Sequence, residues 1–254
     1  MFLEPEARWG AASLKRNGCV LFAPQQLLNT LGPAVAGLEP LSESWSRLPA
    51  DTHLRDGGRY RFRRHSCYVY ETAAGELAPV AHRAHWQPVD YNALHGGMQR
   101  WFEPVEPQVA SSLAWIQLLR AVAALFADVR QVPRWYVEAH QFRIDTAAGI
   151  GRPTPEGAHR DGVDFVAVIL VRRSQIRGGE TRVFEAQGSA GVRFTMTEPW
   201  TALLLDDARV IHETTPILSE LSDEHGHGVR DTLVLTFRAD GFQEPAPGAR
   251  GAPG

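Results

Sequence analysis

Apolar and polar residues alternate along the chain in a way that predicts helices in the first half and short strands in the second. Between residues 111 and 129 (SSLAWIQLLRAVAALFADV) apolar residues recur at steps of three and four, which is the period of one helix face. Ser111 or Ser112 is suited to cap this helix, and Pro133 ends the connection after it. The predicted apolar stripe consists of Leu113, Ile116, Leu119, Ala123 and Phe126.

Shorter patterns precede this helix. Residues 18–22 form a brief apolar run after a glycine, which is typical of a strand, and residues 24–31 begin with a proline at a first helical position. Residues 59–70 (RYRFRRHSCYVY) are rich enough in aromatic and β-branched side chains for a second strand. We interpret residues 39–57 and 72–98, which show no clear period, as loops.

From Trp135 onward the pattern changes to short strands that are mostly separated by glycines and prolines. Strands at such near-regular spacing indicate an antiparallel sandwich or barrel. The predicted strands cover residues 135–145, 164–172, 181–185, 192–197, 202–206 and 232–239.

No repeat and no linker divides the sequence, so we expect one domain over residues 1–243. Within it, helices from about residues 1–130 are expected to pack on a β-core at about residues 132–240. The Pro/Gly/Ala-rich residues 244–254 are expected to form a disordered tail.

Composition narrows the class of protein. Of the 254 residues, 44% are hydrophobic and 22% are charged, which is typical of a globular chain and not of a disordered one. The net charge of -3 disfavours a nucleic-acid partner, and no apolar run is long enough for a transmembrane helix. The first residues do not resemble a signal peptide, and Cys19 and Cys67 cannot form a disulfide framework, so a cytoplasmic location is expected.

The first candidate site is a pair of metal-competent side chains, His159 and Asp161, just before an apolar strand. Residues at i and i+2 on an extended backbone point to the same face, so both can hold one ion. His212 lies 51 residues after Asp161, at the end of a strand-like run, and an antiparallel barrel can return it beside that pair. Two imidazoles and one carboxylate form the facial triad of non-haem Fe(II) oxygenases.

A second candidate is Arg230, at the start of the apolar strand GVRDTLVLTF. A guanidinium is costly to bury there without an anionic partner, and a carboxylate bound through two hydrogen bonds is the natural partner. Thr232 is two residues further on, so it shares that face and offers a hydroxyl donor.

Two further strands carry polar side chains. Gln141 and Arg143 share one face of residues 135–145, which suits a pocket for the carboxylate of a substrate or cosubstrate, or else an edge strand facing water. Arg61 and Arg63 share a face of the earlier strand. We assign Arg63 to substrate binding and interpret Arg61 as a solvated surface residue.

Each feature also has an ordinary structural explanation. A His-x-Asp pair occurs often by chance, His212 alone fits a half-buried core histidine, and Arg230 alone fits an ion pair with Asp231. The order of the residues and their strand-like surroundings together favour a metal site. Other clusters are interpreted as loops or turns: His225-x-His227 as a solvated loop, His82, His85 and His95 as chance neighbours in a loop, and Asp206-Asp207 as a turn.

In this order, the motifs resemble those of the 2-oxoglutarate/Fe(II)-dependent dioxygenases. The similarity covers roughly residues 57–240, and within the family it is greatest to the bacterial branch that contains free L-isoleucine hydroxylases and biofilm-stress-and-motility proteins. The segments that carry it are His159-x-Asp161, residues 177–181 (RGGET), 212–217 (HETTPI), 228–230 (GVR), 61–65 (RFRRH) and 139–143 (AHQFR).

This resemblance implies a mainly β fold with flanking helices, built on a double-stranded β-helix (jelly-roll, cupin-like) core. It implies that His159, Asp161 and His212 are iron ligands. The distal carboxylate of 2-oxoglutarate would be bound by Arg230 and Thr232, with Gln141 as a further cofactor-binding residue. Arg143 and Arg63 would contact the substrate, and the Gly178-Gly179 turn would need positive φ angles.

One departure from the family concerns spacing. His212 and Arg230 are 18 residues apart, which is longer than is common in the family. We expect the polar residues 218–227 (LSELSDEHGH) to form a loop that accommodates the excess. If they do not, Arg209 and Arg238 are the alternative ligands for the carboxylate.

The implied activity uses Fe(II), O2 and 2-oxoglutarate, which is decarboxylated to succinate and CO2 while a C–H bond is hydroxylated. The leading hypothesis is hydroxylation of a small molecule, a free L-amino acid or a close relative. Alternatives are a non-catalytic metal-binding jelly-roll protein in stress or biofilm signalling, and a redox-inert zinc hydrolase on a related barrel. We expect no nucleic-acid or membrane partner, and the oligomeric state stays open, with a homodimer among the options.

Overall fold

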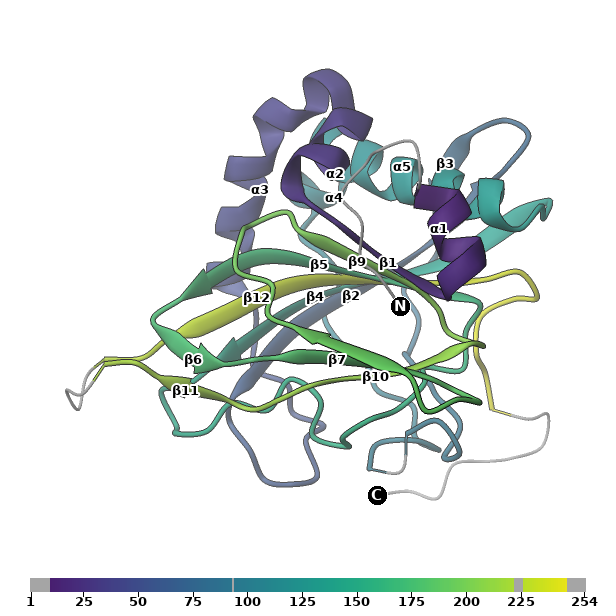
Figure 1. The fold of residues 1–254 in the computed structure, drawn as a ribbon. Coiled ribbons are helices and arrows are strands. Elements are labelled where there is room, and N and C mark those ends of the chain that lie inside the picture. The colour runs from purple at the N-terminus through teal and green to yellow at the C-terminus, as the bar shows by residue number, and fades with distance from the viewer. Residues whose placement is uncertain (1–9, 93, 222–225, 246–254) are drawn as a thin grey trace.

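The computed structural model describes residues 10–92, 94–221 and 226–245, whose arrangement is shown in Figure 1. The expected disordered tail therefore falls mostly outside the described residues. The helices are α1 (Gly10–Asn17), α2 (Pro24–Leu31), η2 (Gly32–Gly37), α3 (Leu38–Glu43), η3 (Ser44–Arg47), α4 (Pro107–Ala110) and α5 (Leu113–Val129), where η denotes a 3-10 helix. The strands are β1 (Cys19–Phe22), β2 (Arg61–Glu71), β3 (Glu76–Pro79), β4 (Arg134–Asp145), β5 (Phe165–Ser174), β6 (Ile176–Gly178), β7 (Thr181–Glu185), β8 (Gly191–Phe194), β9 (Ala202–Asp206), β10 (Val210–Thr214), β11 (Ile217–Ser219) and β12 (Val229–Arg238).

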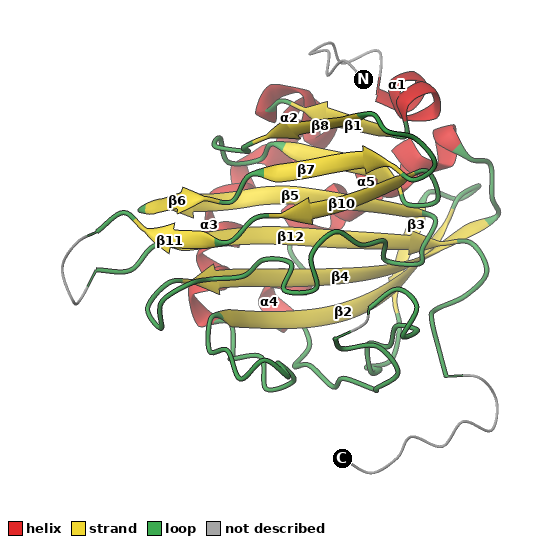
Figure 2. Ribbon diagram, turned by 60° about the horizontal axis from the view of Figure 1, so that its bottom comes forward, coloured by secondary structure: helices red, strands yellow, loops and turns green. Residues whose placement is uncertain are grey.

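The strands form one large antiparallel sheet and two small ones. The large sheet has the order β1-β9-β5-β12-β4-β2-β3, and the small sheets have the orders β10-β7-β8 and β11-β6. The helices lie behind the large sheet and the small sheets lie in front of it (Figure 2). These layers are the jelly-roll core with flanking helices that the sequence predicts.

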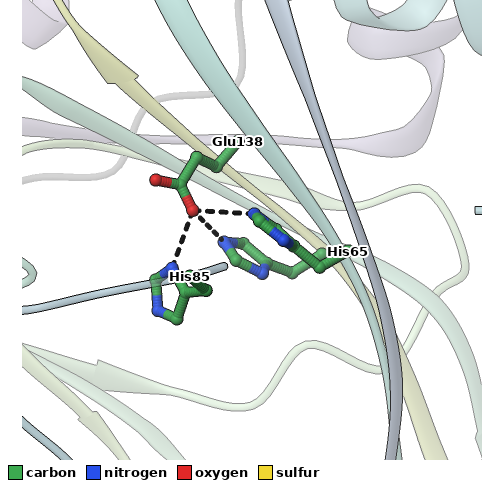
Figure 3. A group of neighbouring side chains, drawn as sticks. His65, His85 and Glu138 are labelled. Atoms are coloured by element: carbon green, nitrogen blue, oxygen red, sulfur yellow. Dashed lines mark hydrogen bonds and ion pairs between the residues drawn. The ribbon is translucent and has the colours of Figure 1, made fainter. Parts of the chain in front are cut away.

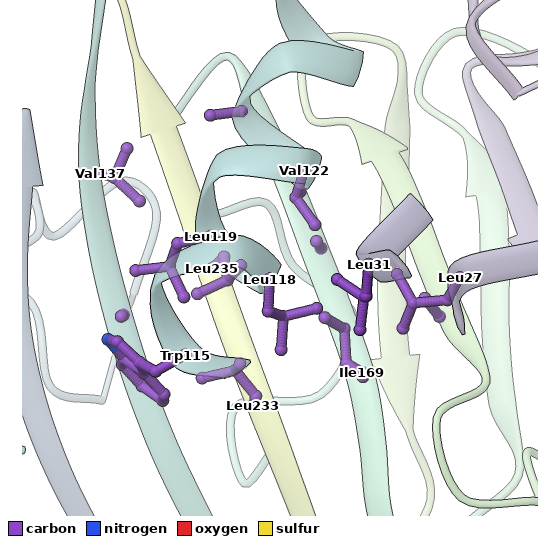
Figure 4. Packing of buried hydrophobic residues seen from close by; sticks show 14 of the residues in the cluster. Leu27, Leu31, Trp115, Leu118, Leu119, Val122, Val137, Ile169, Leu233 and Leu235 are labelled. Carbon is purple, nitrogen blue, oxygen red and sulfur yellow. The ribbon is translucent and has the colours of Figure 1, made fainter. Parts of the chain in front are cut away.

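The main hydrophobic core lies between the helices and the large sheet. Helix α5 rests on this sheet with Leu118 and Leu119 fully buried against strand residues that include Leu233 and Leu235 (Figure 4). Helix α2 adds Leu27 and other side chains at the edge of the same cluster. Burial of these apolar side chains is what fixes the helical layer on the sheet.

Helix α5 begins close to the predicted residue. Ser112 is its N-cap, and the Ser112 hydroxyl accepts a hydrogen bond from the backbone N–H of Trp115 at 3.3 Å. The predicted stripe was wrong at Leu113, which is 58% exposed, because it lies two residues from the buried Trp115 and so on the opposite side of the helix. Within the described part of the chain, no helix has the length and apolar character needed to cross a bilayer.

Strands β4 and β12 separate the hydrophobic core from a cavity on the other side of the sheet. Successive residues of a strand point to opposite faces, so each strand supplies both surfaces. The face toward the helices carries Trp135, Val137, Ala139, Leu233, Leu235 and Phe237. The opposite face lines the cavity with Glu138, His140, Arg230, Thr232, Val234 and Thr236.

Several short elements differ from the predictions. The expected loop at residues 39–57 contains α3 and η3, which are held by burial of Leu38 and Leu41 against the core and not by a long local period. The expected loop at residues 72–98 contains β3, which pairs with β2. Strands β6, β10 and β11 were not counted either, although the run that ends at His212 was noted as strand-like. Strands β6 and β11 have only three residues each, which are too few to show alternation.

Candidate active site

Three side chains that are far apart in the sequence converge at the wall of the cavity. A ligand atom from each of His159, Asp161 and His212 lies within 4.8 Å of the other two. The Nε2 atoms of His159 and His212 are 3.9 and 3.8 Å, respectively, from the two carboxylate oxygens of Asp161. All three residues line the cavity, so the structure brings together the group predicted from the sequence.

Backbone pairing holds the two imidazoles side by side. His212 lies on β10 and His159 in the loop before β5, and each backbone N–H donates to the other's carbonyl at 3.0 Å. The ring centroids are 4.6 Å apart. The Nδ1 atom of His159 donates a hydrogen bond to the carbonyl of Gly157 at 2.9 Å, so in the neutral imidazole Nε2 carries no proton and is available as a ligand.

Asp207 fixes the backbone that carries Asp161. Its carboxylate accepts hydrogen bonds from the backbone N–H groups of Asp161 at 2.9 Å, Gly162 at 2.8 Å and Val163 at 3.1 Å. Burial and the nearby charge of Asp161 raise the pKa of Asp207 to about 7. Sequence reasoning assigned residues 206–207 to a turn, so this positioning role was missed.

The electrostatics of the three side chains suit a bound cation. Burial, followed by the charge of His159, lowers the pKa of His212 well below its usual value, so His212 is neutral and able to ligate. Burial also opposes protonation of His159, but the charges of Asp161, Glu156 and Asp207 together with the hydrogen bond to Gly157 outweigh burial and raise the pKa of His159. A dication is therefore compatible with this cluster, and two imidazole nitrogens with one carboxylate oxygen are the donor set that fits Fe(II).

Arg230 is a buried cation with no acidic partner among the described residues. It is 4% exposed, lines the cavity, and its NH2 atom has no hydrogen bond. Burial and then the charge of Arg173 lower its pKa to about 10, so it remains protonated near neutral pH. Thr232 lines the cavity two residues away on the same strand. This arrangement offers charged and hydroxyl donors to an anion inside the cavity.

The wide spacing between His212 and Arg230 is filled by β11 and a loop, of which residues 222–225 lie outside the described residues. The alternative arginines, Arg209 and Arg238, are not among the cavity-lining residues. Arg209 instead donates to two backbone carbonyls at the end of α1.

The Gly178-Gly179 turn has the positive φ angles expected, 81° and 70°. A side chain at Gly178 would place its Cβ atom 2.3 Å from the carbonyl oxygen of Pro216. Only glycine therefore fits this turn.

Gln141 and Arg143 do not reach the cavity, in contrast to their predicted binding roles. Gln141 is fully buried on the helix-facing side of β4, where its Nε2 atom donates to the hydroxyl of Ser44 at 2.8 Å. Arg143 forms two 2.7 Å hydrogen bonds with the carboxylate of Asp231. The alternation along β4 was assigned correctly, but the opposite face of the strand is the one that lines the cavity.

Arg61 and Arg63 both lie inside the molecule on the cavity wall. The interpretation of Arg61 as a solvated residue was wrong, because it is 6% exposed and its Nε atom donates to Asp51 at 2.7 Å. Arg63, predicted to contact substrate, is 3% exposed and lies on the same wall. Loops outside β2 cover these residues, and no local pattern predicts such a cover.

A second group of buried polar side chains consists of His65, His85, Glu138 and His140, of which all but His65 line the same cavity. Figure 3 shows how His65 and His85 lie around Glu138. The Oε2 atom of Glu138 is 2.8 Å from His65 Nε2, 2.7 Å from His85 Nδ1 and 3.6 Å from His140 Nε2. Sequence reasoning missed this group. His65 on β2 and His140 on β4 are direct cross-strand neighbours, which could have indicated the group. This pairing can be recognised only when the register of the two strands is known.

The remaining predicted loop histidines have separate positions. His82 contacts the carbonyl of Phe102, and His95 accepts a hydrogen bond from the backbone N–H of Arg55. His225 lies outside the described residues. His85, which was interpreted as a chance neighbour, is instead a cavity residue bonded to Glu138.

Comparison with known proteins supplies a family context for this site. The model of the 2OG-Fe dioxygenase family matches residues 42–236. A crystal structure of a bsmA homolog from Methylobium petroleophilum is 50% identical and covers 97% of this chain and 100% of that chain, with a TM-score of 0.90. A search of curated proteins found no match.

More distant solved structures share the fold. The structure of IDO from Bacillus thuringiensis is 16% identical, covers 95% of this chain and 99% of that chain, and has a TM-score of 0.75. The Fe(II)/α-ketoglutarate-dependent dioxygenase TqaL is 19% identical, covers 91% of this chain and 86% of that chain, and has a TM-score of 0.68.

Proposed function

Because this chain belongs to the 2OG-Fe dioxygenase family, we propose that it hydroxylates a small molecule, a free L-amino acid or a close relative, at a site formed by His159, Asp161 and His212. Fe(II), 2-oxoglutarate and O2 are the cofactor and cosubstrates of the family. The observation that carries the ligand assignment is the convergence of these three side chains on one cavity wall.

When bound there, iron with 2-oxoglutarate and O2 supplies the oxidation, which yields succinate, CO2 and a hydroxylated C–H position. The protein supplies ligation, orientation and exclusion of water. His159, Asp161 and His212 would hold the metal ion, because their ligand atoms lie within 4.8 Å of one another. Asp207 would keep the Asp161 carboxylate aimed at the ion through the hydrogen bonds to its backbone segment.

Arg230 and Thr232 would bind the distal carboxylate of 2-oxoglutarate. The support is that Arg230 is protonated, buried and without an acidic partner in the described residues, while Thr232 adds a hydroxyl on the same face. A carboxylate placed there recovers the hydrogen bonds that the buried guanidinium lacks. The proposal of a small substrate is supported by the lining of the cavity, to which strands of the large sheet, strand β10 and the intervening loops all contribute.

The proposed function is tested by succinate formation. Purified protein is incubated with 2-oxoglutarate, with and without Fe(II), against each of the twenty amino acids, and mass spectrometry detects a product about 16 Da heavier, the mass of the one oxygen atom that this chemistry transfers. We expect Fe(II)-dependent succinate, abolished in His159→Ala and in Asp161→Ala. His227→Ala is the matched control, because that side chain is 50% exposed and does not line the cavity. His159, Asp161 and His212 are called the triad below. Full turnover in both His159→Ala and Asp161→Ala would contradict the ligand assignment.

Metal content separates the two histidine clusters. We expect one Fe(II) or Mn(II) ion per chain in an anaerobic titration followed by gel filtration and elemental analysis. The ion should be lost in His159→Ala and kept in His85→Ala, because the latter removes a residue of the second cluster only. If the ion is retained in His159→Ala and lost in His85→Ala, the metal is bound by the cluster of His65, His85, Glu138 and His140, and the proposed ligand assignment is contradicted.

A further inference from the structure

Two buried arginines on the cavity wall, Arg63 and Arg100, have no role in the proposed binding of 2-oxoglutarate. Arg100 is 2% exposed and Arg63 is 3% exposed, and both line the cavity that contains the triad. They come from different segments than Arg230, and Arg100 and Arg230 are influenced by different charged neighbours. The cavity therefore has a second cationic region.

Arg100 lacks an anion. Its NH2 atom donates to the Oε1 atom of Gln87 at 2.8 Å, its Nε atom has no partner, and no described carboxylate is within ion-pair distance. Burial, followed by the charge of Arg61, lowers its pKa to about 10, so it carries its charge near neutral pH. A buried cation left without a counterion is unfavourable, so this position is suited to an anionic ligand.

The backbone holds Arg100 in place without a ligand. Arg100 and His85 form an antiparallel bridge in which each backbone N–H donates to the other's carbonyl at 2.9 Å. The side chain is thus anchored at both its backbone and its Gln87 contact. Because the Arg100 side chain is already held in place, less conformational entropy is lost when a ligand binds to it.

Arg63 is positioned by aromatic rings and a histidine. Its guanidinium carbon lies 3.8 Å from the ring centroid of Phe102 and 4.3 Å from that of Phe142, and its NH2 atom donates to His140 Nδ1 at 2.7 Å. Its nearest acid is Asp51 at 4.0 Å, which already binds Arg61 at 2.7 Å. Arg63 is therefore only weakly neutralised, and its Nε atom has no hydrogen-bond partner in the described part of the chain.

The neighbouring histidine cluster does not offer a competing cation site. Because an arginine can only donate, the Arg63 contact makes His140 Nδ1 an acceptor and leaves the proton on Nε2, which then cannot ligate a metal. In Figure 3 the rings gather around one oxygen of Glu138, at hydrogen-bond distances from His65 and His85. The ring N–H groups of His65 and His85 donate to this oxygen, so these nitrogens are not available to a metal ion, and the positive charges of the nearby arginines disfavour a dication.

Protonation agrees with that assignment. Burial lowers the pKa of His85 to about 3 and also lowers the pKa of His65, so both imidazoles are neutral donors. Burial alone would raise the pKa of Glu138, but its imidazole contacts outweigh burial and keep the carboxyl ionised. The negative charge of Glu138 is thus shared with N–H groups, and it does not pair with Arg100 within ion-pair distance.

Gln87 relates this cationic region to the triad. Its Oε1 atom accepts from Arg100, and its Nε2 atom donates to Asp161 Oδ1 at 3.2 Å. One amide group therefore separates the guanidinium of Arg100 from a triad carboxylate. A ligand that reaches from Arg100 to a metal held by the triad must be short.

We propose that Arg100, supported by Arg63, binds the carboxylate of the substrate. This inference rests on the proposed function and narrows the substrate to a small carboxylic acid whose reactive carbon lies a few bonds from the carboxylate. Arg100 is then a substrate-binding residue separate from Arg230, and Gln87 is a positioning residue between it and Asp161.

The test is a thermal-shift titration of wild type, Arg100→Gln and Arg64→Gln, under anaerobic conditions with Mn(II) and saturating 2-oxoglutarate. The probes are the twenty L-amino acids and, for each one that binds, its carboxamide. Arg64 is the matched control, because it lies next to Arg63 on β2 but pairs with Glu103 and does not line the cavity.

We expect at least one amino acid to stabilise wild type and Arg64→Gln, with its carboxamide at least tenfold weaker. In Arg100→Gln the apparent Kd for the acid should rise at least tenfold, and the preference for acid over amide should disappear. Arg100→Lys should fall between the two, because it keeps the charge but loses the planar pair of donors. For an amino acid that supports turnover, KM should rise in step with this Kd.

The proposal is overturned if Arg100→Gln binds the acid as tightly as wild type, or if no amino acid stabilises wild type. Failure of the proposed function gives a different result. In that case 2-oxoglutarate itself produces no shift and no succinate forms, whereas the amino-acid titration still reports on the site around Arg100.

Discussion

Replacing Arg230 with glutamine should weaken 2-oxoglutarate binding without weakening the fold. Arg230 is 4% exposed and protonated, and its NH2 atom has no partner among the described residues. A carboxylate bound to it gains charged hydrogen bonds, and losing one such bond costs about 2–3 kcal/mol. At about 1.4 kcal/mol per tenfold, this corresponds to a rise in Kd of roughly 30- to 150-fold.

A thermal-shift assay with Mn(II) in place of Fe(II) measures this effect in the absence of turnover. At 2-oxoglutarate equal to 100 times the wild-type Kd, ligand binding stabilises wild type by about 2.7 kcal/mol, and a 100-fold weaker variant by about 0.4 kcal/mol. At about 2–4 °C per kcal/mol for a chain of this size, wild type should gain roughly 5–10 °C in Tm and the variant roughly 1 °C.

The ligand-free proteins provide the second half of the test. Arg230→Gln removes a buried charge that forms no ion pair with any described residue, so its Tm without 2-oxoglutarate should equal or exceed that of wild type. Arg172→Gln is the control, since Arg172 is an exposed residue of the neighbouring strand β5. A wild-type ligand shift in Arg230→Gln would refute the assignment of this residue to the distal carboxylate.

Three further predictions concern stability and reactivity. Leu118→Ala should lower the free energy of unfolding by about 2–5 kcal/mol in urea titrations, since it removes a fully buried side chain beneath α5, and a loss below 1 kcal/mol would contradict the packing. Burial opposes ionisation of Asp51, but the charges of Arg61 and Arg63 together with the hydrogen bonds from His53 and Arg61 outweigh burial and lower the pKa of Asp51. This stabilisation is present above the unfolded pKa of about 4 and is lost as pH falls through the folded pKa, so wild type should lose more stability than Asp51→Asn when titrated below about pH 4. Burial raises the pKa values of the Cys19 and Cys67 thiols, that of Cys19 to about 11, so both should resist a thiol-specific chromophoric reagent at pH 8 until denaturant is added, and rapid reaction in the native state would show that the thiols are accessible.

The sequence predicts the positions of several strands well, whether the strand is long or short. The predicted residues 135–145 and 202–206 correspond closely to β4 and β9. The short pair β6 and β11 was not predicted, because three residues carry no measurable period and form only when their partner is in place. The first helical layer was predicted in part, since α3 depends on burial against α5 and η2 and not on its own sequence.

The site shows the same division between local and long-range information. His159 and Asp161 are neighbours in sequence, so their shared position follows from local geometry. That His212 joins them was implied by the family resemblance, and the structure brings it there through the bridge to His159.

Gln141 shows why alternation alone was insufficient. Both faces of β4 carry polar residues, so the pattern could not tell which face meets the cavity. The partner of Gln141 is Ser44, in a segment whose helical structure was itself not predicted. Arg100 and Gln87 come from aperiodic segments, and their importance depends on contacts across the fold.

The reciprocal backbone bonds between residues 159 and 212 have a consequence for how the protein handles its ion. Because these bonds and the hydrogen bonds of Asp207 to the loop join groups that are not themselves candidate metal ligands, we expect the coordinating side chains to stay close together after chelation. Metal binding and removal should then be reversible at a preformed site. We expect no refolding phase, and the circular dichroism spectra of the metal-bound and metal-free protein should be nearly identical.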